Sequence, residues 1–201
     1  MSLFVQENIK KHQIRQFYRQ QRKALSPAEQ LQAGQELLAQ CLQNSLLNTV
    51  NNIACYLAND GEIDLSPLIK YCWQHNKQIY LPVLHPFTKG NLLFIAYHSD
   101  SEMQINKFGI HEPNIACSKI CPLVQLDVIF TPLVAFDIQG HRLGMGAGFY
   151  DRTLAPLQRI KSNTQVIGVA HNCQRSTGSL KVEKWDIPMQ KIITPDKLYS
   201  C

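Results

Sequence analysis

Long apolar runs are missing from this sequence. No stretch approaches the roughly 18 consecutive apolar residues that a membrane-spanning helix needs. The start, MSLFVQENIKKHQIRQFYRQQRK, lacks the uninterrupted apolar segment of a secretory signal. It also lacks acids after Glu7, as transit peptides do, but its basic residues have a better use, described below. We therefore expect no membrane association and a cytoplasmic protein.

Disulfide and zinc signatures are also lacking. The seven cysteines are odd in number and irregularly spaced. The only close pair, Cys117 and Cys121, has no second pair or nearby His to complete a zinc site. Several cysteines lie in apolar segments, such as Cys55 in IACYL, where a thiol packs as a small hydrophobe. The sequence thus predicts reduced, structural thiols.

What is present is an ordinary globular composition. The 201 residues are 45% hydrophobic and 17% charged, without internal repeats, low-complexity tracts or long linkers. We expect a single domain spanning residues 1–201. The net charge of +5 suits either anionic small molecules or nucleic acid and does not choose between them.

Helix and strand signals alternate along the chain. Ser26-Pro27-Ala28-Glu29 predicts a helix start, with a Ser cap, Pro at the first helical position and a Glu that completes a capping box. Other predicted helices span 65–74 and 153–160, and predicted strands span 53–57, 78–84, 92–97, 126–136 (broken by Pro132), 166–170 and 191–194. The strands are rich in Val, Ile and Leu, as in sheets covered on both faces. We expect a three-layer, Rossmann-like α/β domain with a largely parallel sheet and an N-terminal helical segment, binding ligands at the carboxyl ends of its strands.

The most unusual stretch is RLGMGAGFYDR, residues 142–152, in which Gly144, Gly146 and Gly148 alternate. Because glycine costs conformational entropy, this spacing indicates a sharp turn or a molecule lying against the backbone. A glycine-rich loop between a strand and a helix can bind an anion through backbone N–H groups, and the bracketing Arg142 and Arg152 suit phosphate contacts. The spacing matches neither the Walker A loop nor the dinucleotide fingerprint. A tight turn with two solvated arginines stays open.

Two further features favour a nucleotide. Asp151 would repel a neighbouring phosphate unless Mg²⁺ lay between them; otherwise it would cap the helix. In IKKHQIRQFYRQQRKAL, Lys11, Arg15, Arg19 and Lys23 form one cationic stripe on a helix. Like charges at this spacing repel by roughly 0.2–0.5 kcal/mol per pair, so the stripe favours a bound anion. A solvated face and a nucleic-acid-binding helix stay open, although no base-stacking or groove-reading motif accompanies the stripe.

PLVAFDIQGHRLGMGAGFYDRTLA (132–155) resembles the signature of the 5-formyltetrahydrofolate cyclo-ligase family: an apolar strand, F-D-x-x-G-x-R-L-G, a glycine loop and Y-D-R. Weaker stretches at 15–26, 56–64, 108–113 and 168–188 support the resemblance in the expected order, so it covers nearly the whole chain. It implies conversion of 5-formyltetrahydrofolate to 5,10-methenyltetrahydrofolate, with release of ADP and phosphate from ATP. It also implies a phosphorylated formyl (iminophosphate) intermediate that N10 of the folate attacks, with Mg²⁺ as the cofactor.

The resemblance also implies a role for each site residue. The implied ATP contacts are Lys11, Arg15, Arg142, Gly144, Gly146, Gly148 and Tyr150. The implied folate contacts are Leu57, Glu62, Met145, Gly146, Ala147, Gly148 and Phe149. Tyr150 and Arg142 are the implied catalytic residues, and Asp151, with Asp186 as a candidate second carboxylate, is the implied Mg²⁺ ligand.

Some residues depart from the family pattern or have a second interpretation. Phe149 stands where the family often has Tyr, and Met145 and Ala147 replace residues that are frequently Arg, Gly or Lys. Glu62 can accept hydrogen bonds from a pterin's amino and ring N–H groups, but it also suits a solvated turn. Glu112 in FGIHEP matches the pattern without an implied role.

We expect a monomer that binds ATP and 5-formyltetrahydrofolate and no nucleic acid, with any preference for polyglutamylated folate left open. Two rival functions stay open on the residues alone. One is a non-catalytic nucleotide- or RNA-binding module that uses the basic helix. The other is a sugar-phosphate isomerase or CoA-transferase-like enzyme of similar architecture, because fold does not fix function.

Overall fold

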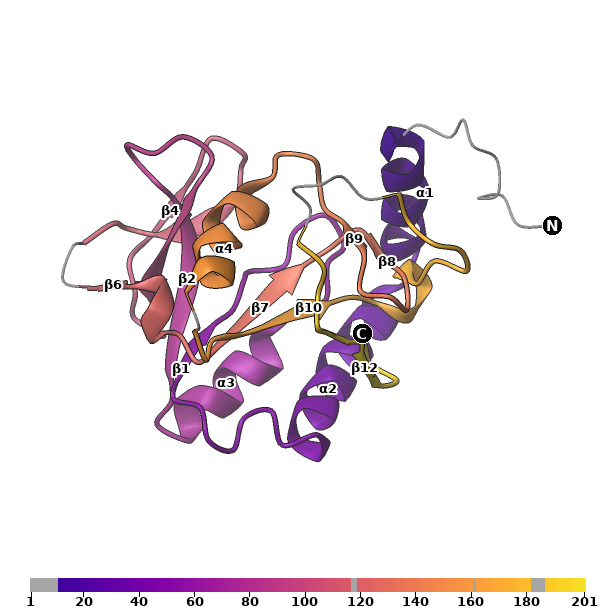
Figure 1. The fold of residues 1–201 in the computed structure, drawn as a ribbon. Helices are drawn as coiled ribbons and strands as arrows, with labels where there is room; N and C mark the ends of the chain where they lie inside the picture. The colour runs from indigo at the N-terminus through magenta and orange to yellow at the C-terminus, as the bar shows by residue number, and fades with distance from the viewer. Residues whose placement is uncertain (1–10, 117–118, 161, 182–186) are drawn as a thin grey trace.

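The computed structural model describes residues 11–116, 119–160, 162–181 and 187–201, and it is built on one eight-stranded sheet (Figure 1). The strand order is β12-β11-β10-β7-β1-β2-β3-β6. These strands are β1 (Asn52–Ala54), β2 (Gln78–Leu84), β3 (Leu92–Ala96), β6 (Ile120–Cys121), β7 (Val128–Pro132), β10 (Gln165–Val169), β11 (Lys191–Ile193) and β12 (Leu198–Ser200). The five central strands, β11 to β2, run parallel, whereas β12, β3 and β6 pair antiparallel at the two edges. The largely parallel sheet is confirmed; its antiparallel edges were not predicted.

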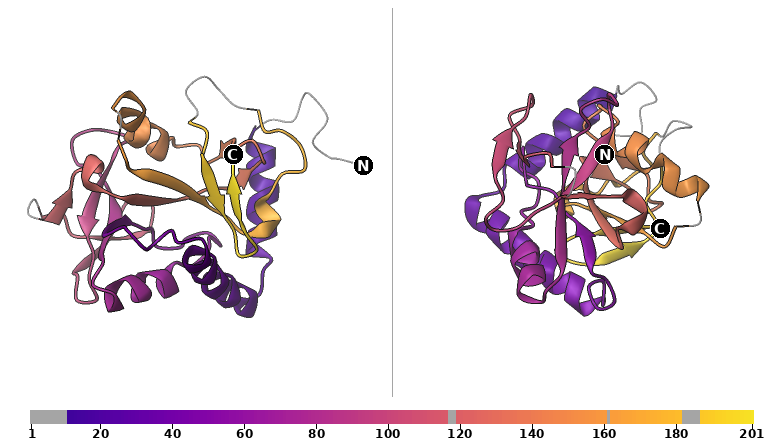
Figure 2. Two further views of the ribbon diagram at one scale, coloured as in Figure 1. Left: turned by 60° about the horizontal axis from the view of Figure 1, so that its bottom comes forward. Right: turned by 90° about the vertical axis from the view of Figure 1, so that its left-hand side faces the viewer.

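Helices cover both faces of this sheet. α2 (Pro27–Gln43) and α3 (Ser66–Gln74) lie on one face and α4 (Phe149–Arg159) lies on the other, as Figures 1 and 2 show from three directions. Alternate strand residues supply the two cores: Ile53 and Phe130 pack under α2 and α3, and Ala54 and Ile129 pack with α4. This period of two follows from strand geometry and produces the expected three layers.

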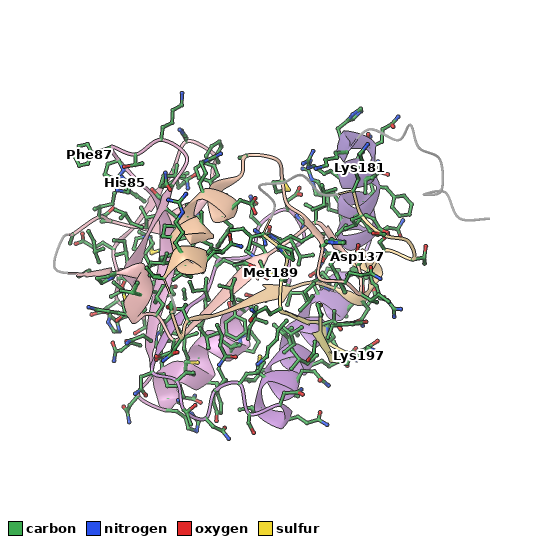
Figure 3. All side chains as sticks on the ribbon, in the orientation of Figure 1. His85, Phe87, Asp137, Lys181, Met189 and Lys197 are labelled. Carbon is green, nitrogen blue, oxygen red and sulfur yellow. The ribbon has the colours of Figure 1, made fainter. Side chains whose placement is uncertain are left out.

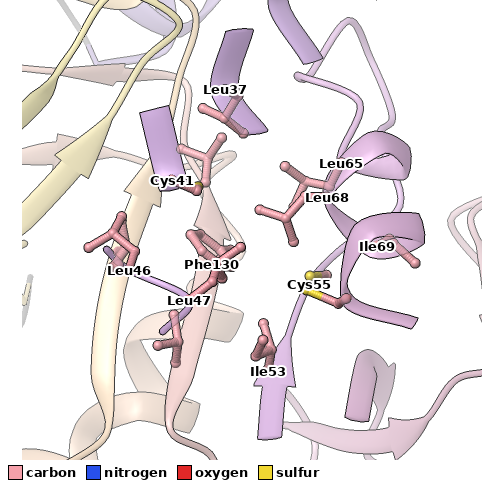
Figure 4. Close-up of a cluster of buried hydrophobic side chains, with 14 of the residues drawn as sticks. Leu37, Cys41, Leu46, Leu47, Ile53, Cys55, Leu65, Leu68, Ile69 and Phe130 are labelled. Carbon is pink, nitrogen blue, oxygen red and sulfur yellow. The ribbon is translucent and has the colours of Figure 1, made fainter. Parts of the chain in front are cut away.

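The larger core lies between the sheet and the α2–α3 layer (Figure 4). Leu37 and Cys41 of α2 meet Leu68 of α3 above Phe130 of β7, and all four side chains are fully buried. Burial raises the pKa of the Cys41 thiol to about 12, so this thiol stays protonated and packs as an apolar group. The described cysteines are free thiols, and Cys41, Cys55, Cys72 and Cys121 are buried, as expected of structural thiols, whereas Cys201 is exposed; Cys117 lies outside the described residues.

The local signals explain where several elements begin and end. At the start of α2, the Glu29 N–H donates to Ser26 Oγ at 3.3 Å and the Ser26 N–H donates to Glu29 Oε2 at 2.7 Å, which confirms the capping box. β7 ends at Pro132, which cannot donate a ladder hydrogen bond. α4 begins four residues before the predicted position of 153, because Gly148 caps it in the left-handed conformation (φ 65°).

The remainder of the predicted strand 126–136 forms a separate hairpin, β8 (Ala135–Phe136) with β9 (Arg142–Leu143). Asp137, which is fully buried, holds the turn of this hairpin (Figure 3). Its carboxylate accepts the backbone N–H groups of Gln139 and His141, both at 3.0 Å, and of Leu180 at 2.8 Å. The F-D-x-x-G part of the signature is therefore structural: it fixes the hairpin from which the glycine loop starts.

Two further elements frame the site. α1 (Lys11–Lys23) packs against the 3₁₀ turn η3 (Asn172–Gln174) and against β8, so the basic N-terminal segment is a helix, as predicted. A second hairpin, β4 (Met103–Ile105) with β5 (His111–Pro113), packs beside β2, and the 3₁₀ turn η2 (Leu123–Gln125) precedes β7. Within the described ranges, no helix has the length and apolar character needed to cross a bilayer.

Candidate active site

A cavity of about 980 Å³ lies at the carboxyl edge of the parallel strands. Tyr56 and Leu57 line it just after β1, and Pro132 and Leu133 line it at the end of β7. The sheet changes its winding direction here, since β2 lies on one side of β1 while β7, β10 and β11 follow on the other. Open α/β sheets bind ligands at this point. The volume is at the upper end of the range of about 300–1,000 Å³ for small-molecule sites, which suits two ligands side by side.

The glycine loop, residues 144–148, forms one wall of the cavity. Gly146 (φ 101°) and Gly148 (φ 65°) adopt backbone conformations that other residues rarely take. Arg15 Nε donates to the Gly144 carbonyl at 2.7 Å, and the guanidinium lies 3.3 Å from where a Cβ on Gly146 would stand. The alternating glycines therefore serve both a turn and a close approach.

Arg152 secures the other end of the glycine loop. It donates to the carbonyl of Ala147 and, at 2.9 Å, to the carbonyl of Gly90 in the β2–β3 turn. Arg152 also lines the cavity, so its contact with phosphate stays a prediction. The same turn carries Phe87 outward, 92% exposed, away from the site (Figure 3).

The cationic stripe of α1 is divided between two tasks. Lys11 and Arg15 line the cavity, as does Arg142 from β9. Arg19 and Lys23 instead form ion pairs with Asp60, in the loop after β1; the Arg19 pair measures 2.6 Å. The prediction of one anion-binding stripe is therefore wrong for its second half, where a carboxylate of the same chain provides the negative charge.

Asp151 lies in the first turn of α4, near the positive end of the helix, and forms an ion pair with Arg142. Asp186 lies outside the described residues. In the part of the chain that the structure describes, no three His, Cys, Asp or Glu side chains gather to hold a metal ion by themselves. One carboxylate nevertheless fits Mg²⁺, which is commonly bound by one or two carboxylates together with substrate phosphates and water. The donor set suits a metal that arrives with a nucleotide.

Glu62 also lines the cavity, close to the hydroxyls of Tyr56 and Tyr150. Its Oε2 accepts the Asn59 N–H at 3.1 Å, and its side chain is only 13% exposed. Burial raises the pKa of this carboxyl to about 7. Burial also raises the pKa of the neighbouring Tyr150 hydroxyl, with a smaller contribution from Glu62. A carboxylate so placed is costly unless a ligand brings hydrogen-bond donors to it.

The β4–β5 hairpin supplies site residues to which the sequence assigned no role. Phe108, between its strands, meets Phe149 of α4 edge to face, with ring centroids 5.8 Å apart. Glu112 lines the cavity and is 6% exposed; its Oε2 accepts the Leu84 N–H at 3.2 Å and the Asn106 side-chain amide at 3.0 Å. Glu112 therefore ties the hairpin to β2. The signal was present in FGIHEP, but the partners of Glu112 lie on another strand.

Every described residue to which the family resemblance gave a role in binding or catalysis lines this cavity. These residues are Lys11, Arg15, Leu57, Glu62, Arg142, Gly144, Met145, Gly146, Ala147, Gly148, Phe149, Tyr150 and Asp151. Their individual roles stay predictions.

Comparison with known proteins identifies the family. The model of the 5-formyltetrahydrofolate cyclo-ligase family matches residues 7–195. The chain belongs to this family. It is 48% identical over 182 residues to the cyclo-ligase of Escherichia coli K12, covering 90% of this chain and 98% of that one. It is 47% identical over 184 residues to the Haemophilus influenzae cyclo-ligase, covering 92% and 97%.

A solved structure agrees. The NMR structure of Aquifex aeolicus 5,10-methenyltetrahydrofolate synthetase matches with a TM-score of 0.79 and 28% identity, over 96% of this chain and 93% of that one. The resemblance found in the sequence is thus confirmed, and with it the cyclo-ligase fold. Membership of the cyclo-ligase family also makes this chain an enzyme.

Proposed function

We propose that this cyclo-ligase uses ATP and Mg²⁺ to convert 5-formyltetrahydrofolate to 5,10-methenyltetrahydrofolate, releasing ADP and phosphate. The observation that supports this most is one cavity lined by two unlike kinds of residue. Lys11, Arg15, Arg142 and the glycine loop suit a polyphosphate, and the same cavity is lined by Glu62 and by apolar and aromatic groups. Joining a phosphate donor to a formyl acceptor needs such a shared space.

The chemistry explains why no nucleophilic side chain is required. The formyl oxygen on N5 is a poor leaving group until it attacks the γ-phosphorus of ATP and the bond to ADP breaks. N10 then attacks the formyl carbon of the iminophosphate, loses its proton, and the C–O bond breaks to release phosphate. Both steps depend on positioning and charge stabilisation, as other phosphoryl transfers do.

On the nucleotide side, Lys11, Arg15 and Arg142 are proposed to contact the phosphates together with the backbone N–H groups of the glycine loop. In the ligand-free chain, Arg142 and Asp151 neutralise each other. We expect ATP to replace this pair, with Arg142 turning to phosphate and Asp151 to Mg²⁺. The bound Mg²⁺ would offset the charge on the phosphoryl group as it is transferred.

On the folate side, Glu62 is proposed to accept hydrogen bonds from the amino and ring N–H groups of the pterin, while Leu57 and Phe149 contact its apolar surface. Tyr150 would lie near the reacting formyl group. Its raised pKa keeps the hydroxyl protonated, so it can donate a hydrogen bond to the oxygen that is phosphorylated.

The direct test mixes purified protein with 5-formyltetrahydrofolate, ATP and Mg²⁺ and follows the absorbance of the methenyl product. We expect absorbance only when all three are present. Absence of product under conditions in which the Escherichia coli relative is active would overturn the proposal. Turnover of a sugar phosphate without ATP would favour the isomerase or transferase alternative. Tight, salt-sensitive RNA binding that is lost in Arg15→Gln would favour the binding-module alternative.

A further inference from the structure

Arg22 is buried behind the active site rather than in it. The side chain comes from the inner face of α1, is completely inaccessible to solvent and does not line the cavity. Its Nε donates to the Asp60 carbonyl at 2.8 Å, its Nη2 to Asp60 Oδ2 at 3.1 Å, and its Nη1 to the Leu133 carbonyl at 3.1 Å. Burying a guanidinium is costly, so this placement calls for a reason beyond packing.

The reason lies in the turn that Arg22 holds, residues 59–62. Asp60 (φ 55°) and Gly61 (φ 77°) both adopt the left-handed conformation, which is unfavourable for Asp60. Arg22 fixes this turn from behind, and its Nη2 lies 3.7 Å from Glu62 Oε1. Arg22 therefore fixes the backbone that carries Glu62. Its guanidinium also places a positive charge beside the Glu62 carboxyl group.

We propose that Arg22 is a positioning residue for Glu62: it fixes the 59–62 turn and places a positive charge beside the carboxyl group that accepts hydrogen bonds from the pterin. The inference deepens the proposed function and rests on it, because Glu62 is there the folate-binding carboxylate. Arg22 acts through Glu62 and does not touch the substrate.

The charges around Glu62 support this role. Burial has the largest effect and raises the pKa of the Glu62 carboxyl; Arg22, and then the Asn59 N–H, lower it, and Asp60 raises it slightly. The hydroxyls of Tyr56 and Tyr150 also face Glu62, and burial raises their pKa values, so both stay neutral. His171 meets the Gly61 backbone of the same turn, and burial, with a smaller contribution from Arg22, lowers the pKa of His171 to about 4, so that ring is neutral above pH 6. Glu62 is therefore the group whose charge changes near neutral pH, and Arg22 opposes the effect of its burial.

The test measures the affinity for 5-formyltetrahydrofolate from pH 5.5 to 9 by calorimetry, without ATP. In the wild-type chain, affinity should rise with pH as Glu62 ionises. In Arg22→Gln, the midpoint of this rise should move to higher pH. An opposite charge within about 4–6 Å changes a pKa by at least about one unit, so affinity at pH 7 should fall about fivefold or more, and most of this loss should be recovered at pH 9. Arg22→Lys keeps the charge and should bind more weakly at every pH while its midpoint stays close to that of the wild type.

Arg22→Gln is expected to fold, because two of the three acceptors of Arg22 keep other donors. The Asp60 carboxylate retains Arg19 and Lys23, and the Leu133 carbonyl retains the Gln174 side-chain amide at 2.7 Å. Circular dichroism would verify the fold. Should Arg22→Gln not fold, Asp60→Asn tests the effect of the charges around Glu62 in the opposite direction. Loss of the negative charge of Asp60 should move the midpoint of the rise in affinity to lower pH.

Arg19→Gln is the matched control. Arg19 lies on the same helix and binds the same carboxylate, but its side chain is 40% exposed. Its loss should leave the midpoint unchanged. A midpoint in Arg22→Gln equal to that of the wild type or of Arg19→Gln would overturn the inference.

Carbon-13 NMR titration of Glu62 in the ligand-free proteins separates this inference from the proposed function. A wild-type chain that binds no 5-formyltetrahydrofolate at any pH would overturn the proposed function. The titration would still decide the role of Arg22: a higher midpoint for Glu62 in Arg22→Gln supports it, and an unchanged midpoint overturns it.

Discussion

Replacing Glu62 by Gln should stabilise the fold at alkaline pH while removing the binding of 5-formyltetrahydrofolate. Burial raises the pKa of this carboxyl from 4.5 to about 7, so the folded chain holds the proton more tightly than the unfolded chain does. The contribution of Glu62 to stability is therefore fully present below pH 4.5 and is lost as the pH rises through 7. The chain carries this cost in the free state, as is common for groups that serve binding.

The magnitude follows from the pKa values. One pKa unit corresponds to about 1.4 kcal/mol, so ionising Glu62 lowers the free energy of unfolding by about 3 kcal/mol at pH 8. Gln has nearly the same shape and no charge to lose. The free energy of unfolding of Glu62→Gln should therefore be about 3 kcal/mol higher than that of the wild type at pH 8, and the two values should be similar near pH 4. For a chain of this length, this difference corresponds to roughly 10 °C in melting temperature.

The assay is urea unfolding of both proteins at pH 5, 6, 7 and 8, followed by circular dichroism. The difference between the two free energies removes the contributions of groups that titrate alike in both proteins. The gap should widen with pH, with most of the change below pH 7. If the difference between the two free energies of unfolding stayed constant across this pH range, the pKa of Glu62 would not be raised in the folded chain, and the reasoning would fail.

Three other substitutions test other parts of the site. Asp151→Asn should raise the Mg²⁺ concentration that half-saturates activity by at least about tenfold, since the proposed carboxylate ligand is lost; an unaltered Mg²⁺ titration would remove Asp151 from the metal site. Gly148→Ala places a side chain at φ 65° and only 2.9 Å from Arg152, so we expect a loss of about 1–2 kcal/mol in thermal unfolding and a higher KM for ATP. Glu112→Ala leaves the partly buried N–H of Leu84 without that acceptor and should lower the free energy of unfolding by about 1–3 kcal/mol, measured by urea unfolding.

The glycine prediction has a matched control in Gly178→Ala. Gly178 has no neighbour within 4 Å of an added Cβ and does not line the cavity, so this variant should keep the KM for ATP of the wild type. If Gly148→Ala and Gly178→Ala had the same KM for ATP, the left-handed conformation of Gly148 would not be needed for ATP binding.

Local signals in the sequence were sufficient for the framework of the fold. The capping box of Ser26 and Glu29 depends on residues three apart, and the apolar run of β2 was predicted with its observed bounds, Gln78–Leu84. The sequence did not reveal which strands form the edges. β3 and β12 each pair antiparallel with the strand that precedes them in the chain, β2 and β11, and β6 pairs antiparallel with β3. The periodicity of a strand reports neither its partner nor its direction.

The site shows the same limit. The glycine loop, Asp151 and the cavity-facing half of α1 could be found from spacing and resemblance, because their residues lie close together in the chain. Arg19, Arg22 and Lys23 pair with Asp60, about forty positions away in the chain. The spacing of basic residues on a helix does not indicate that a carboxylate of the same chain will pair with them. The tie between Glu112 and Leu84 was missed for the same reason.

The most direct test of the proposed reaction follows the formyl oxygen. 5-Formyltetrahydrofolate labelled with ¹⁸O in the formyl group would be converted with unlabelled ATP, and the released phosphate analysed by mass spectrometry. If the formyl oxygen attacks the γ-phosphorus, each phosphate should carry one ¹⁸O atom. Unlabelled phosphate, with the label recovered in water, would contradict the account.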